Sequence, residues 1–70
     1  MSRYIVEASR KKGFFEPYES RKYYLVSEER LSKMLLQTGS WAVWSAKWVN
    51  PALTSISQLK EIYGEIEEVD

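Results

Sequence analysis

The sequence contains no cysteine and no histidine. Without cysteine it can form neither a disulfide framework nor a thiolate metal site. Without histidine it also lacks the commonest zinc ligand and the commonest general base at neutral pH. A hydrolase built from the remaining residue types needs a carboxylate pair, a Ser-Lys arrangement or a tyrosine acid. No such arrangement stands out, so we expect a non-enzymatic protein without a metal or a cofactor.

Glycine and long apolar runs are also scarce. The three glycines lie at positions 13, 39 and 64, which is too far apart for a glycine-rich phosphate-binding loop. No segment approaches the roughly 20 apolar residues that span a bilayer, and the first residues lack the apolar run of a signal peptide. The sequence therefore predicts a soluble, cytoplasmic protein with no membrane partner.

Aromatic residues are abundant instead, with three Trp, five Tyr and two Phe among 70 residues. A chain of this length is enough for a single domain, residues 1–70, but only for a small core. Each aromatic side chain can bury roughly 150–250 Å², and aromatic residues also mark contact surfaces. Their positions along the chain must separate these two uses.

The charges cancel overall but are unevenly distributed. Residues 1–33 hold eight Lys and Arg against five Glu, and residues 34–70 hold two Lys against five acids. The chain is therefore polar without the global field that draws a whole protein to nucleic acid.

Hydrophobic periodicity indicates strands alternating with two helices. Helix starts are expected at Ser27 and Ser55, where a hydroxyl can cap the first turn, and Gly64 is expected to end the second helix. A helix continuing to the end is the alternative, because Ile62, Ile66 and Val69 also fit its period. The expected strands are residues 3–9, 21–26, 41–49 and 65–69. The sequence thus predicts an α+β fold of order β-β-α-β-α-β, a small four-stranded, largely antiparallel sheet with two helices on one face.

The strand 41–49 carries all three tryptophans, and strict alternation places them on two faces. Trp44 and Trp48 flank Ala46 on one face, which we expect to form the core beneath the helices. The other face is then open and presents a protein-binding patch of charged and aromatic residues. This patch comprises Ile5, Tyr23, Trp41, Val43 and Lys47. In the competing interpretation, residues 10–20 fold back as a lid and bury Trp41.

The segment between the first two strands combines basic and aromatic residues. Phosphate contact and base stacking require this combination. The residues are Arg10, Lys11, Lys12, Phe14 and Phe15. They form the alternative hypothesis, a nucleic-acid-binding hairpin.

The leading hypothesis is a small binding protein that acts through protein–protein interaction, of the kind found among phage or accessory inhibitors of a host factor. Its expected partner is another protein, and nucleic acid is the alternative. A homodimer formed through the open sheet face is compatible with either.

Overall fold

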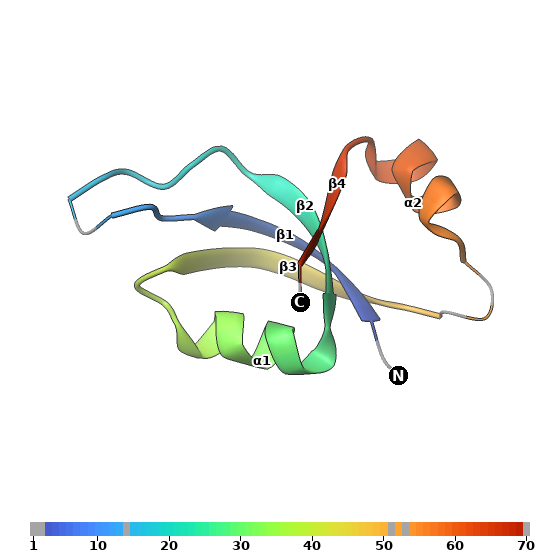
Figure 1. The fold of residues 1–70 in the computed structure, drawn as a ribbon, viewed down its shortest axis with the longest axis horizontal. Coiled ribbons are helices and arrows are strands. Elements are labelled where there is room, and N and C mark those ends of the chain that lie inside the picture. The colour runs from blue at the N-terminus through green and yellow to red at the C-terminus, as the bar shows by residue number, and fades with distance from the viewer. Residues whose placement is uncertain (1–2, 14, 51, 53, 70) are drawn as a thin grey trace.

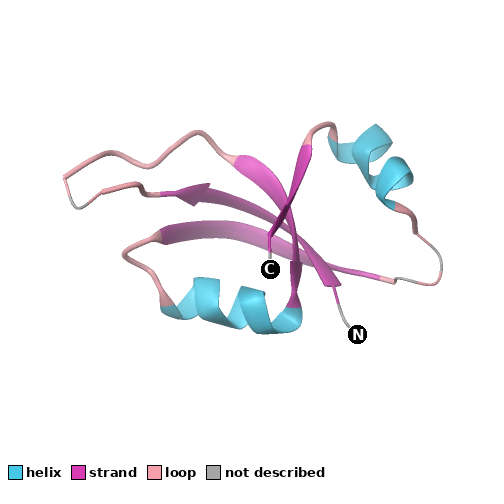
Figure 2. Ribbon diagram, viewed as in Figure 1, coloured by secondary structure: helices cyan, strands magenta, loops and turns pink. Residues whose placement is uncertain are grey.

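The computed structural model describes residues 3–13, 15–50, 52 and 54–69. Phe14 of the proposed basic hairpin lies outside these residues. The elements follow the expected order (Figures 1 and 2). They are β1 (Arg3–Arg10), β2 (Lys22–Ser27), α1 (Glu28–Leu36), β3 (Trp41–Val49), α2 (Ile56–Tyr63) and β4 (Ile66–Val69).

The four strands form one mixed sheet in the order β3-β1-β2-β4. β1 pairs antiparallel with both β2 and β3, whereas β4 lies parallel to β2. The predicted α+β class and the largely antiparallel sheet are therefore confirmed. The predicted strand after Gly64 is confirmed as well, because α2 ends at Tyr63 and β4 joins the sheet.

Both helices begin at the serines that the sequence indicated. The Ser27 hydroxyl accepts a hydrogen bond from the Arg30 amide at 3.2 Å, which satisfies one free donor of the first turn of α1. Ser55 and Gln58 form a reciprocal capping box at the start of α2. Gly64 then has a φ of 81°, a left-handed conformation that ends the helix.

The two helices cover opposite faces of the sheet, so the expectation that they share one face is wrong. Leu31 and Met34 of α1 pack in a buried cluster with Val6 of β1. Leu59 of α2 packs in a second cluster with Ile5, the neighbour of Val6 in β1. Neighbouring strand residues point to opposite faces. The sheet therefore lies between the helices, as Figure 1 shows.

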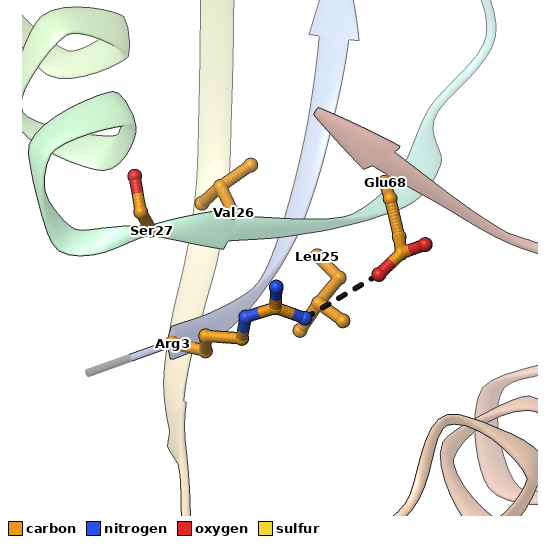
Figure 3. Close-up of a pocket in the computed structure, with 5 residues that line it drawn as sticks. All are labelled: Arg3, Leu25, Val26, Ser27 and Glu68. Carbon is orange, nitrogen blue, oxygen red and sulfur yellow. Dashed lines mark hydrogen bonds and ion pairs between the residues drawn. The ribbon is translucent and has the colours of Figure 1, made fainter. Parts of the chain in front are cut away.

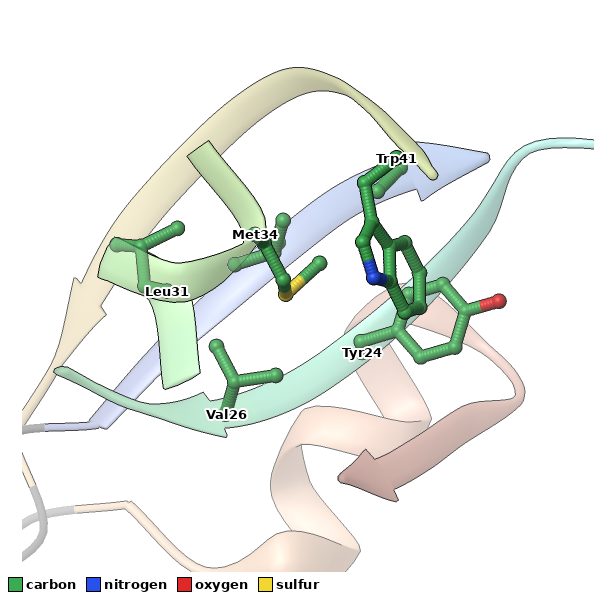
Figure 4. Packing of buried hydrophobic residues seen from close by; sticks show 7 residues of the cluster. Tyr24, Val26, Leu31, Met34 and Trp41 are labelled. Atoms are coloured by element: carbon green, nitrogen blue, oxygen red, sulfur yellow. The ribbon is translucent and has the colours of Figure 1, made fainter. Parts of the chain in front are cut away.

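The larger cluster is built around Tyr24 and Trp41 (Figure 4). Their rings meet edge to face, with centroids 5.2 Å apart and an interplanar angle of 88°, a geometry that aromatic pairs favour. Burial raises the pKa of the Tyr24 phenol above its ordinary value of 10.0. Trp41 is only 8% exposed.

A β-bulge in β3 explains why Trp41 faces the core. Glu7 of β1 lies opposite Ser45, but the next residue, Ala8, lies opposite Val43. Trp44 is therefore an extra residue, and the alternation of side chains shifts at this point. Trp41 and Val43 therefore face α1. Strict alternation along residues 41–49 would have placed them on the opposite face of the sheet.

Candidate protein-contact surface

β3 forms one edge of the sheet and is the most exposed strand. Its residues from Trp44 to Trp48 are all exposed to solvent. Trp44 is 50% exposed and Trp48 is 58% exposed, so the expectation that these two form the core is wrong. Trp44 is exposed because it is the extra residue of the bulge. Trp48 is exposed because it lies on the edge strand: it faces Tyr4 of β1, and among the described residues no strand pairs with its other side.

The five residues expected on one open face are divided between the two faces. Ile5 is buried beneath α2, and Tyr23 is half-buried against Tyr63, with ring centroids 5.0 Å apart. Trp41 is buried and Val43 half-buried on the α1 side. Only Lys47 is exposed. The placement of these residues on a shared exposed face is therefore wrong.

The alternative, in which residues 10–20 form a lid that buries Trp41, holds only in part. Trp41 is buried, but it lies in the α1 cluster beside Tyr24. From the segment 10–20, Tyr18 approaches the same region, and its hydroxyl donates a hydrogen bond to the Thr38 carbonyl at 3.1 Å. Phe15 is 94% exposed.

A hollow of about 350 Å³ lies between α1 and the first half of β3. We call it the α1–β3 groove. Its buried lining residues, Met34 and Trp41, belong to the core cluster, and its exposed lining residues include Leu35 and Trp44. The full lining is Tyr18, Met34, Leu35, Thr38, Trp41, Ala42, Val43 and Trp44. The groove thus combines an apolar interior with an aromatic rim, as ligand-binding hollows commonly do.

Three of the lining aromatic rings each have a cation over them. The Arg10 guanidinium lies 4.8 Å from the centroid of Trp41, and the Arg21 guanidinium lies 4.5 Å from that of Trp44. The Lys11 ammonium lies 5.7 Å from the centroid of Tyr18. These distances are within the range of cation–π attraction. Positive charge from residues 10–21 therefore lies beside the groove.

The predicted basic hairpin is a loop that extends beyond the strands between β1 and β2 (Figure 2). Two of its cations, Arg10 and Lys11, lie against groove aromatics, and Lys12 forms an ion pair with Glu19 at 3.2 Å. The structure therefore brings Arg10 and Lys11 next to the α1–β3 groove. Phe15 is an exposed side chain.

A second hollow, of about 280 Å³, lies at the other end of β1 (Figure 3). Arg3 reaches across β2 to Glu68 of β4, with 3.3 Å between Nη1 and Oε1. Both side chains are about half exposed, so the pair contributes little to stability. This hollow has mainly polar walls and no aromatic lining.

The chain matches no known protein family, no curated protein and no solved structure. Within the part of the chain that the structure describes, no helix is long and apolar enough to cross a membrane.

Proposed function

We propose that the chain is a non-enzymatic binding protein that contacts another protein through the exposed side of β3. The observation that carries this proposal is the pair of tryptophans, Trp44 and Trp48, that β3 leaves half exposed or more. Tryptophan is among the residues most enriched at interface hot spots, because it contributes a large rigid contact area. The α1–β3 groove is lined in part by Trp44 and can accommodate a side chain of the partner.

The proposed partner is a different protein and not a second copy of this chain. Pairing of two β3 edges would need a regular strand, but the bulge at Trp44 interrupts the ladder. Lys47 adds a charge to the same edge. Bulges and lysines are devices by which sheet edges avoid pairing with each other. We therefore assign the contact to side chains of β3 and the groove, and not to backbone pairing.

We further propose that binding acts by covering the partner's surface, which makes the chain an inhibitor of a cytoplasmic protein. Covering a surface requires no catalytic residue, and the exposed tryptophans of β3 can supply the contact. Most of the affinity is expected from Trp44 and Trp48, with the surrounding polar residues excluding water.

The test is affinity capture from cell lysate followed by quantitative mass spectrometry, using the wild-type chain and three variants. Trp44→Ala and Trp48→Ala remove the proposed contacts. Ile62→Ala is the matched control, because Ile62 is a large apolar side chain, 71% exposed, on the remote helix α2. We expect one set of proteins to be captured by the wild type and the Ile62 variant and lost with both tryptophan variants. Equal capture by all four chains would contradict the proposal.

Direct titration with single- and double-stranded oligonucleotides at low salt tests the alternative. If the loop cations bound phosphates, affinity would fall with salt by a slope of about −0.7 to −0.9 per contact. Replacing Arg10, Lys11 and Lys12 together would then abolish the binding. Such a result would mean that the partner is a nucleic acid and not a protein.

A further inference from the structure

The α1–β3 groove has two properties that together restrict what it can bind. Its interior is apolar: Met34 and Trp41 are buried core residues, and Leu35 and Val43 line the walls. A hollow of about 350 Å³ is at the lower end of the range of ligand pockets. It suits one large apolar side chain better than an extended ligand.

The surroundings of the groove are cationic. Arg10, Lys11 and Arg21 each lie over one of its aromatic rings. Residues 10–21, which supply them, contain four Lys and Arg against two Glu. Glu7 offsets part of the Arg21 charge at 4.0 Å, and Glu19 pairs with Lys12. The remaining excess is positive on the β3 side, whereas Glu67 and Glu68 lie on the opposite edge in β4.

From these two properties we infer that the groove binds an acidic segment of the partner protein, one that inserts an apolar side chain flanked by Asp or Glu. The apolar side chain contacts Leu35 and Trp44, and the flanking carboxylates face the cations of residues 10–21. Complementary charge speeds association and selects the partner more than it adds affinity. This inference rests on the proposed function above and specifies its partner.

The same cations make the groove a poor platform for nucleic-acid bases. Stacking of successive bases requires free aromatic faces in a row. Here Trp41 is buried, and a cation already lies over one face of Tyr18 and of Trp44. An apolar side chain with neighbouring carboxylates fits the groove without displacing these contacts.

The first experiment is a selection from a display library of random 12-residue peptides against the full chain, with Trp44→Ala as the counter-selection target. We expect the enriched peptides to share a Leu, Ile, Phe or Trp with Asp or Glu within three residues of it. Enrichment without this acidic preference would overturn the inference. It would leave the proposed function intact if the peptides still required Trp44.

The second experiment measures the best peptide, made synthetically, against two arginine variants. Arg21→Gln removes a cation of the groove. Arg3→Gln is the matched control, because the two side chains are equally exposed, at 52% and 49%, and each has one Glu partner. Arg3 lies about 23 Å along β1 from the Arg10 end of the groove. We expect Arg21→Gln to weaken binding about two- to fivefold, as one exposed charge pair does, and Arg3→Gln to leave it unchanged.

The remaining outcomes separate the inference from the proposed function. If both arginine variants bind the peptide with equal affinity, and salt does not change that affinity, the inference of an acidic partner is wrong. The proposed function would still stand. Failure to enrich any peptide that binds the wild type and not Trp44→Ala would remove the groove and the proposed function together. Displacement of the peptide by a 12-nucleotide oligo-dT at equal concentration would overturn the assignment of the partner to proteins.

Discussion

The two edges of the sheet are built in opposite ways. β4 is a strand of four residues, Ile66–Val69, and two of them are glutamates. β3 is a strand of nine residues, Trp41–Val49, with one charge and two exposed tryptophans. A short, charged edge is protected from pairing with other chains, whereas exposed aromatic side chains are typical of contact surfaces. The exposed tryptophans of β3 therefore favour this edge as the proposed contact surface.

The difference extends to what lies behind each edge. Beside β3, Arg10 at the end of β1 and two cations of the β1–β2 loop lie over aromatic rings of the α1–β3 groove. Beside β4, Glu68 pairs with Arg3 across β2 (Figure 3). The uneven charge of the two halves of the sequence thus becomes a difference between the two edges. In the proposed function, the positive charge beside the apolar hollow selects the partner.

Truncation of Trp41 has the largest expected effect on stability. Trp41→Ala removes a buried ring that packs against Tyr24 and Met34, so we expect a loss of about 3–5 kcal/mol in the free energy of unfolding. Chemical denaturation measures it. Trp41→Phe, which keeps an aromatic edge near Tyr24, should lose less. An unchanged midpoint for Trp41→Ala would mean that the first residue of β3 belongs to the surface.

A smaller effect is expected at the turn that leads into β4. Gly64 has a φ of 81°, and a Cβ added there meets no atom within 4 Å. Gly64→Ala therefore adds backbone strain without a steric clash, at a cost of about 1–3 kcal/mol.

Gly39→Ala is the control for this prediction, because a Cβ there also meets open space and its φ is not positive. We expect it to leave stability unchanged or to raise it by up to about 1 kcal/mol, as alanine restricts the unfolded chain. Equal midpoints for the two variants in urea would contradict the role of Gly64 in ending α2.

The smallest effect on stability is expected at Trp48. Its side chain is 58% exposed on the free edge of the sheet, so Trp48→Ala should cost no more than about 1 kcal/mol, the span of strand propensities. Thermal melting of Trp48→Ala and Trp41→Ala under the same conditions compares the two losses of stability directly. A loss of several kcal/mol at Trp48 would place it in the core and remove one of the two contact residues from β3.

Most of the fold could be predicted from the sequence because its signals are local. Ser27, Ser55 and Gly64 set the helix ends through their own hydrogen bonds and dihedral angles. The alternation of apolar and polar residues predicted where the strands lie in the sequence. None of these signals depends on contacts between distant residues.

The candidate site could not be predicted, because it depends on two features that local patterns do not encode. One is the bulge at Trp44, which shifts the alternation and exchanges the environments of Trp41 and Trp44. The odd spacing of these two tryptophans is compatible with a bulge but does not require one. The other is the position of α2 behind β1 and β2, which buries Ile5 on the face expected to be open. That position follows from how the whole chain packs.

The central claim is that β3 places one tryptophan in the core and two at the contact surface. ¹⁹F NMR of the chain labelled with 5-fluorotryptophan, in the presence of a soluble paramagnetic agent, tests it most directly. Single Trp→Phe variants assign the three resonances. We predict that the Trp44 and Trp48 signals broaden strongly and that the Trp41 signal is protected. Broadening of Trp41 together with protection of Trp44 and Trp48 would contradict the account.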